Sequence, residues 1–108
     1  MQKIIGGVTA AKGFKAWGRN CGIKKSGKPD LALVCSEVPA IAAGVFTTNK
    51  VKAAPVLLSQ QHLIQEYAQA ILINSGNANA CTGKEGFDHA EKTAQAVAKL
   101  FKILPEQV

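Results

Sequence analysis

The chain has 108 residues, of which 47% are hydrophobic and 19% are charged, so it is neither a disordered tail nor a two-domain protein. Thirteen Lys and Arg against seven Asp and Glu give a net charge of +6, yet Arg19 is the single arginine and aromatic residues make up only 6%. Because nucleic-acid recognition relies on arginine and on stacking aromatic side chains, this composition argues against a nucleic-acid partner.

The cysteines and histidines do not follow a metal-binding pattern. Cys21, Cys35 and Cys81 lack C-x-x-C spacing, and the two histidines lie far apart in the sequence. Free thiols are typical of a reducing compartment, so we expect a cytoplasmic protein without a metal site. The apolar stretch at residues 4–11 is short and broken by glycine, which predicts neither a secretory signal nor a membrane span.

The first half of the chain is expected to form strands. Residues 13–17 lie in a glycine-rich region and are expected to be a short strand. The apolar runs 31–36 and 41–47 predict two antiparallel strands joined by a tight turn. Residues 54–58 predict a third strand, with Pro55 near its start or at a sheet edge, where a missing N–H is tolerated.

The second half alternates helices with strands. Ser59 is a candidate N-cap for a helix that ends near Gln69, and residues 70–74 follow as a buried strand. Apolar residues at three- and four-residue steps then predict a helix from about Phe87 to Lys102. Residues 104–108 leave this helix as if they entered another strand.

This order of elements predicts an α/β fold. We expect a mixed sheet with packed helices, sandwich-like, in which residues 1–108 form a single incomplete portion of a larger domain. An exposed apolar patch is expected where the rest of that domain packs.

The loop between the last predicted strand and the last predicted helix carries the most chemical information. Backbone N–H groups at the start of a helix are unpaired and can stabilise an anion or a developing oxyanion. Glycines let a ligand approach the backbone, and polar side chains add hydrogen-bond donors. An ordinary turn, in which these residues only satisfy local backbone geometry, explains the pattern equally well. The residues concerned are Gly76, Asn77, Asn79, Thr82 and Gly83.

Two other readings of this region fit the sequence less well. A phosphate-binding loop of the form G-x-x-x-x-G-K-[ST] needs four residues between its glycines, but six separate Gly76 from Gly83, and Glu85 follows Lys84. A nucleophile and base made of Cys81 and His89 is also disfavoured, because cysteine is commonly a small buried hydrophobic residue and His89 lies in the first turn of the last predicted helix.

A resemblance to a known enzyme family rests on four segments. They are GGVTAAKGFKAWG at 6–18, GIK to DLALV at 22–34, AAGVFTTNKVKAAPV at 42–56 and NSGNANACTG at 74–83. Together they resemble the amino-terminal part of the alpha chain in the ornithine acetyltransferase family of arginine biosynthesis, also called bifunctional glutamate N-acetyltransferase.

The resemblance implies covalent catalysis by a threonine that lies outside these 108 residues. A precursor cleaves itself before that threonine, giving an alpha chain and a beta chain, and the threonine becomes the nucleophile. An acetyl-enzyme intermediate passes acetyl from N-acetylornithine to glutamate without a cofactor, and bifunctional members also accept acetyl-CoA. Thr82 and Gly83 match the oxyanion-stabilising pair of the family.

The same resemblance implies the partners of this chain. They are the remainder of the alpha chain and the beta chain, joined in an alpha/beta hetero-oligomer, so we expect the isolated 108 residues to be inactive. Two alternatives remain open. One is a related self-processing amidohydrolase or aminopeptidase with an N-terminal nucleophile, which passes the acyl group to water. The other is a small basic module that binds an anionic metabolite or an RNA backbone.

Overall fold

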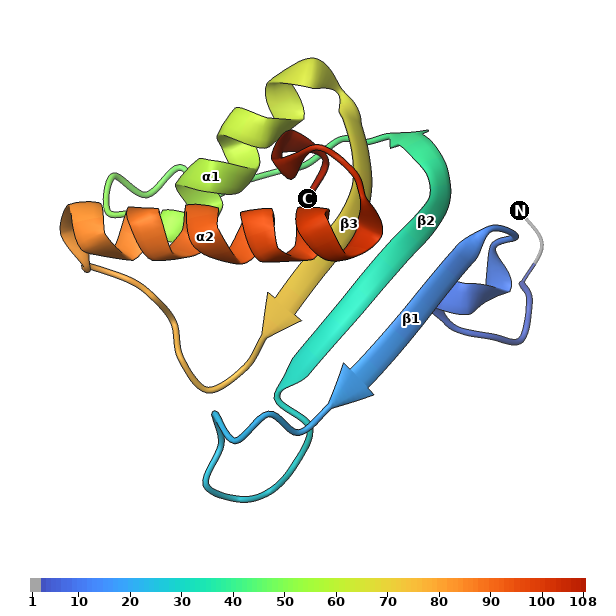
Figure 1. The fold of residues 1–108 in the computed structure, drawn as a ribbon, viewed down its shortest axis with the longest axis horizontal. Coiled ribbons are helices and arrows are strands. Elements are labelled where there is room, and N and C mark those ends of the chain that lie inside the picture. The colour runs from blue at the N-terminus through green and yellow to red at the C-terminus, as the bar shows by residue number, and fades with distance from the viewer. Residues whose placement is uncertain (1–2) are drawn as a thin grey trace.

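The computed structural model describes residues 3–108, which form a three-stranded sheet with two helices (Figure 1). The strands lie in the order β1-β2-β3. The predicted α/β class is therefore confirmed. The elements are β1 (Phe14–Arg19), β2 (Leu31–Ile41), β3 (Tyr67–Asn74), α1 (Ala54–His62) and α2 (Gly83–Phe101), with 3-10 turns η1 (Val8–Ala10), η2 (Leu63–Gln65) and η3 (Pro105–Gln107).

The sheet of the described residues is antiparallel rather than mixed. Strand β2 is central and pairs antiparallel with both β1 and β3. In this register Trp17, Leu33 and Leu72 are neighbours across the three strands. Because side chains alternate between the two faces of a strand, these three residues share one face.

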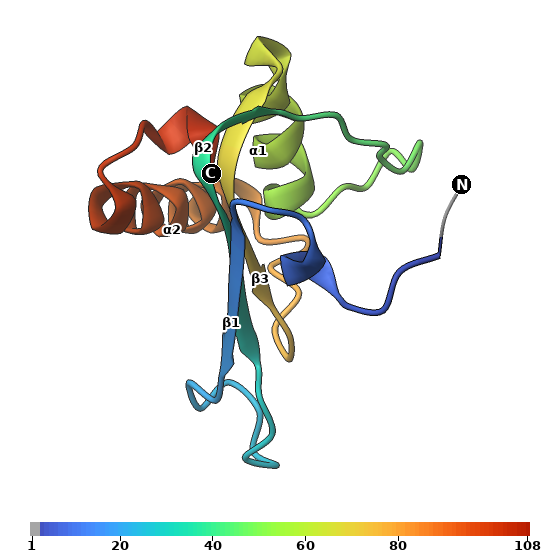
Figure 2. The same cartoon turned by 90° about the vertical axis from the view of Figure 1, so that its right-hand side faces the viewer.

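Helix α2 packs on the face that carries Trp17. The helix buries Ala94, Val97 and Ala98, which recur at the spacing of one helical face. The rings of Trp17 and Phe101 lie with centroids 6.3 Å apart, which joins β1 to the end of α2. Figure 2 shows the sheet nearly edge-on, with α2 lying along one side of it.

The opposite face of the sheet is apolar and largely uncovered. We call it the open face and define it by Phe14, Val34, Ile71 and Ile73, which share it by strand alternation and register. Ile71 is 57% exposed and Ile73 is 50% exposed. An apolar surface of this kind is typical of a contact with another part of a protein.

The expected tight turn between two short strands is wrong. Strand β2 runs from residue 31 to Ile41 without a break, and residues 42–49 have no regular structure. The pairing of β2 with β3 shifts between Cys35 and Ala40, and the strand curves visibly (Figure 1). Pro39 lies inside this irregular stretch, where the absence of its N–H breaks no regular ladder of hydrogen bonds.

The expected strand at 54–58 is also wrong, because these residues begin α1. Pro55 lies in the first turn of the helix, where the N–H that proline lacks would be unpaired in any case. Ser59 is therefore inside the helix and does not cap it. The helix ends at His62 instead of near Gln69.

The remaining boundaries differ by a few residues. Strand β3 begins three residues earlier than expected, directly after Glu66, whose φ of 62° ends the preceding 3-10 turn. Helix α2 begins at Gly83, four residues before the expected start, so the predicted loop is shorter and Gly83 belongs to the helix. The expected final strand is wrong, since Pro105–Gln107 form a 3-10 turn.

Candidate functional site

The candidate site is the loop between β3 and the start of α2 (Figure 1). Its backbone bends sharply, with left-handed φ angles of 43° at Asn79, 58° at Cys81 and 60° at Gly83. Asparagine and glycine adopt such angles at least cost, which explains their density in this segment. The bends bring residues 79, 82 and 86 into contact.

Thr82 and Gly83, the predicted oxyanion pair, lie side by side at the start of α2, and both are exposed. Thr82 is the N-cap residue, but its side chain caps no backbone N–H. Among residues 3–108 the Gly83 N–H has no acceptor, as is usual for the first N–H groups of a helix. An exposed hydroxyl and an exposed amide N–H are thus adjacent at the positive end of the helix dipole.

Asn79 holds the Thr82 hydroxyl in place. The Thr82 hydroxyl donates to the Asn79 Oδ1 at 2.7 Å, and the Asn79 Nδ2 donates to the Gly86 carbonyl at 2.8 Å. The backbone N–H of Ala54 donates to the Asn79 carbonyl at 3.2 Å, which ties the start of α1 to the same loop. Asn79 therefore connects the starts of both helices.

Gly86 leaves the space that the Thr82 side chain occupies. A Cβ atom at position 86 would collide with the Thr82 hydroxyl and side chain and would lie 2.5 Å from the Asn79 Oδ1. Gly86 was not among the functional residues predicted from the sequence. Glycine inside a helix is unfavourable relative to alanine, and that is the signal that would have marked this position.

A second loop, residues 20–29, supports the candidate site. A Cβ atom on Gly76 would lie 3.0 Å from the Lys24 side chain and 3.1 Å from the Ile23 side chain, so the two loops are in close contact. The Ser75 N–H donates to the carbonyl of Asp30 at 2.8 Å. The position of the site loop thus depends on the order of the 20–29 loop.

The carboxylate of Asp30 orders the 20–29 loop. This residue is only 3% exposed, and its two side-chain oxygens accept hydrogen bonds from the N–H of Lys24 at 2.8 Å and from the N–H of Cys21 at 2.7 Å. The N–H of Lys24, and next that of Cys21, stabilise the charged carboxylate and so hold the pKa of the Asp30 carboxyl below its usual value. Burial acts in the opposite direction but does not outweigh them. Asp30 was not among the functional residues predicted from the sequence.

We expect Asp30→Asn to remove a contribution to the stability of the full-length protein that is present at neutral pH and lost in acid. A carboxyl with a lowered pKa in the folded state stabilises the fold above its unfolded pKa of about 4, and this contribution disappears as the pH falls through the folded pKa. The melting temperature of the asparagine variant should therefore be lower at neutral pH, and the difference from wild type should shrink below about pH 4. A difference that stays constant down to low pH would contradict this role.

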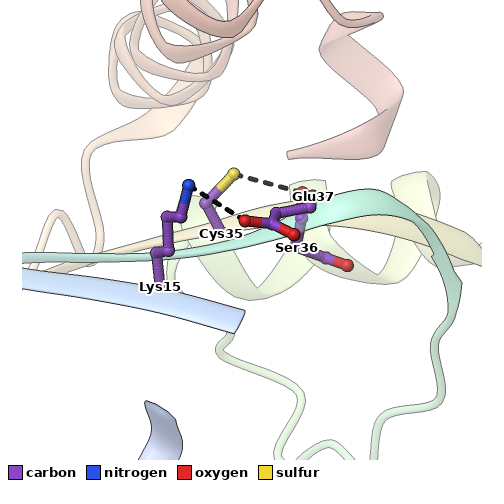
Figure 3. Close-up of polar contacts among 4 residues, drawn as sticks. All are labelled: Lys15, Cys35, Ser36 and Glu37. Atoms are coloured by element: carbon purple, nitrogen blue, oxygen red, sulfur yellow. Dashed lines mark hydrogen bonds and ion pairs between the residues drawn. The ribbon is translucent and has the colours of Figure 1, made fainter. Parts of the chain in front are cut away.

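The other candidate residues are not assembled into a site. No hydrogen bond joins Cys81 to His89 within residues 3–108, and the His89 carbonyl instead accepts from the Thr93 hydroxyl at 2.7 Å. Cys35 is buried and donates to the Ser36 carbonyl at 3.4 Å (Figure 3).

The remaining features of the described residues add nothing to this site. Lys15 and Glu37 form an ion pair at 2.9 Å, but both side chains are more than half exposed, so the pair contributes little to stability (Figure 3). No group of three or more metal-binding side chains gathers anywhere in residues 3–108. None of the helices in that range combines the length and apolar character needed to cross a bilayer.

Comparison with protein families gives a match over most of the chain. The model of the ArgJ family matches residues 15–108. The arginine biosynthesis bifunctional protein ArgJ of Thermosynechococcus vestitus is 56% identical over 99% of this chain. The protein of the same name from Mycolicibacterium paratuberculosis is 62% identical over 85% of it. The chain spans about a quarter of the length of these relatives, 26% and 23% respectively.

Two solved structures share the fold. The arginine biosynthesis bifunctional protein ArgJ of Bacillus halodurans matches with a TM-score of 0.92 and 44% identity, over 95% of this chain and 54% of that chain. Ornithine acetyltransferase of Mycobacterium tuberculosis, solved with ornithine, matches with a TM-score of 0.84 and 57% identity, over 86% of this chain and 49% of that chain.

Proposed function

Because the chain belongs to the ArgJ family, we propose that it supplies the oxyanion-stabilising part of an acetyltransferase of arginine biosynthesis. The observation that carries this proposal is the pairing of Thr82 and Gly83 at the exposed start of α2. A hydroxyl and an unpaired N–H next to each other are the groups that stabilise a negatively charged oxygen. Three of the relatives above are named bifunctional proteins of arginine biosynthesis, and the fourth is named an ornithine acetyltransferase and was solved with ornithine.

The proposed chemistry has two tetrahedral intermediates. A threonine hydroxyl, deprotonated by its own terminal amine, attacks the acetyl carbonyl of N-acetylornithine. The carbonyl oxygen becomes an oxyanion that Thr82 and Gly83 stabilise, and collapse of the intermediate protonates and releases ornithine. The amine of glutamate then attacks the acetyl-threonine ester and gives a proton to the terminal amine, which forms a second oxyanion. Collapse of this intermediate breaks the bond between the acetyl carbon and the threonine oxygen, which takes the proton back as N-acetylglutamate leaves. Each donor lowers these barriers by about 3 to 4 kcal/mol.

The nucleophile and most substrate contacts belong, in this proposal, to the rest of the protein. The chain spans about a quarter of its relatives, so the remainder of an alpha chain and a beta chain would provide these groups. The open face supports this proposal, because its apolar residues suit burial against a further layer of the same protein. Acetyl-CoA is a candidate second acetyl donor, and no other cofactor enters the reaction.

We expect the isolated residues 1–108 to show no acetyl transfer, while the full-length protein converts N-acetylornithine and glutamate into ornithine and N-acetylglutamate. The measurement is product analysis by mass spectrometry, with both proteins purified in the same way. Acetate in place of N-acetylglutamate from the full-length protein would instead indicate an amidohydrolase. Acetyl transfer by the isolated chain would contradict the proposal that the nucleophile and most substrate contacts belong to the rest of the protein.

A further inference from the structure

We propose that Asn79 is a positioning residue for catalysis, which holds the Thr82 hydroxyl within hydrogen-bonding reach of the place where the oxyanion forms. This inference rests on the proposed role of Thr82 and adds a residue to it. Asn79 is half-buried, whereas Thr82 is exposed, so the asparagine contacts the hydroxyl from the protein interior and leaves its solvent side free.

The side-chain amide of Asn79 has a defined orientation. Its Nδ2 donates to the Gly86 carbonyl at 2.8 Å, and a carbonyl can only accept. The Oδ1 must therefore face the other way, where it accepts from the Thr82 hydroxyl at 2.7 Å. The first turn of α2 thus fixes the orientation of the Asn79 amide, and the amide in turn fixes the position of the Thr82 hydroxyl.

The backbone of Asn79 is constrained as well. Its φ of 43° lies in the left-handed region that asparagine tolerates, and its carbonyl accepts from the Ala54 N–H at 3.2 Å. The residue is thus attached to α1 through its main chain and to α2 through its side chain. The Thr82 hydroxyl therefore donates to a residue that is itself held at its main chain and at its side chain.

This arrangement fits a hydroxyl that changes its hydrogen-bond acceptor during the reaction. In the resting state the hydroxyl donates to a neutral amide oxygen. A negatively charged oxygen is a stronger acceptor than a neutral one, so the hydrogen turns toward the oxyanion when it forms. Only the hydrogen needs to rotate, because the oxygen already lies in the space that Gly86 leaves and is held there by its hydrogen bond to Asn79.

The test is a double-mutant cycle in the full-length enzyme, with Asn79→Gly and Thr82→Ala alone and together. Glycine accepts the left-handed backbone and keeps the carbonyl that Ala54 contacts, so it removes only the two side-chain hydrogen bonds. Cys81→Gly is the matched control, because it places a glycine at φ 58° in the same loop where the exposed side chain makes no hydrogen bond within residues 3–108.

We expect Asn79→Gly to lower kcat about tenfold with little change in KM, because the oxyanion exists only during turnover. In the Thr82→Ala background the same substitution should have no further effect on kcat, and Cys81→Gly should leave kcat unchanged. Equal losses from Asn79→Gly in both backgrounds, or an unchanged or higher kcat from that variant alone, would overturn this inference while leaving the role of Thr82 intact. An unchanged kcat for Thr82→Ala would overturn both.

Discussion

Thr82→Ala in the full-length enzyme is expected to lower kcat by about a hundredfold or more, with a much smaller effect on KM. The hydroxyl is one of two donors that we propose for the oxyanion, and the charge on that oxygen develops only as the acetyl carbonyl is attacked. The Gly83 N–H remains in the variant, so residual turnover should persist.

The structure indicates that this variant folds. Thr82 is exposed, and within residues 3–108 its side chain makes a single hydrogen bond, to Asn79, whose amide keeps its bond to the Gly86 carbonyl. The purified, folded full-length variant is assayed by steady-state kinetics, and its melting temperature is compared with that of wild type. Thr82→Ser, which keeps the hydroxyl, should retain most of the activity. A wild-type kcat for the alanine variant would make the Thr82 hydroxyl a purely structural group.

Gly86→Ala is expected to reduce both stability and turnover. Alanine normally stabilises a helix relative to glycine by about 0.5–1 kcal/mol, but here its Cβ would collide with the Thr82 side chain. Overpacking of this kind costs about 1–3 kcal/mol, so the substitution should destabilise the protein instead of stabilising it. The displaced Thr82 hydroxyl should also lower kcat.

Differential scanning calorimetry and kinetics of the full-length enzyme test this second prediction. The melting temperature of Gly86→Ala should fall by several degrees. Gly7→Ala is the comparison, because an added Cβ there has no other atom of residues 3–108 within 4 Å and should leave both the melting temperature and kcat close to wild type. A Gly86→Ala enzyme that is as stable and as active as wild type would contradict this prediction, because it would show that the Thr82 side chain can move away from the added Cβ without loss of stability or turnover.

The parts of the fold that the sequence predicted correctly are those with a strong apolar pattern. The runs 31–36 and 70–74 lie in β2 and β3, and the periodic segment 87–102 forms most of α2. Pairing partners and the direction of the sheet depend on contacts distant in the sequence, so a mixed sheet was expected where an antiparallel one exists.

The wrong elements have local causes. Residues 54–58 are apolar and short, which suits a buried strand as well as a helix, and Pro55 is acceptable at the start of either. Residues 41–47 are also apolar, but only Ile41 pairs with β3, and the chain then leaves the sheet. An apolar run indicates burial more reliably than it indicates the conformation of the backbone.

The candidate site was predictable in composition but not in its internal contacts. Glycine and asparagine density marked the loop, and the resemblance to a known family pointed to Thr82 and Gly83. The amide of Asn79 bonds to residue 86, and its carbonyl bonds to residue 54, 25 positions earlier in the chain. No spacing rule predicts these contacts, because the packing of α1 beside α2 determines them.

A crystal structure of the intact enzyme with a tetrahedral analogue of the acetyl-transfer intermediate tests the proposed function most directly. We predict that the analogue oxygen lies about 2.7–3.1 Å from both the Thr82 Oγ1 and the Gly83 amide nitrogen. An analogue oxygen bound by other donors, with Thr82 and Gly83 directed away from it, would contradict the proposed function.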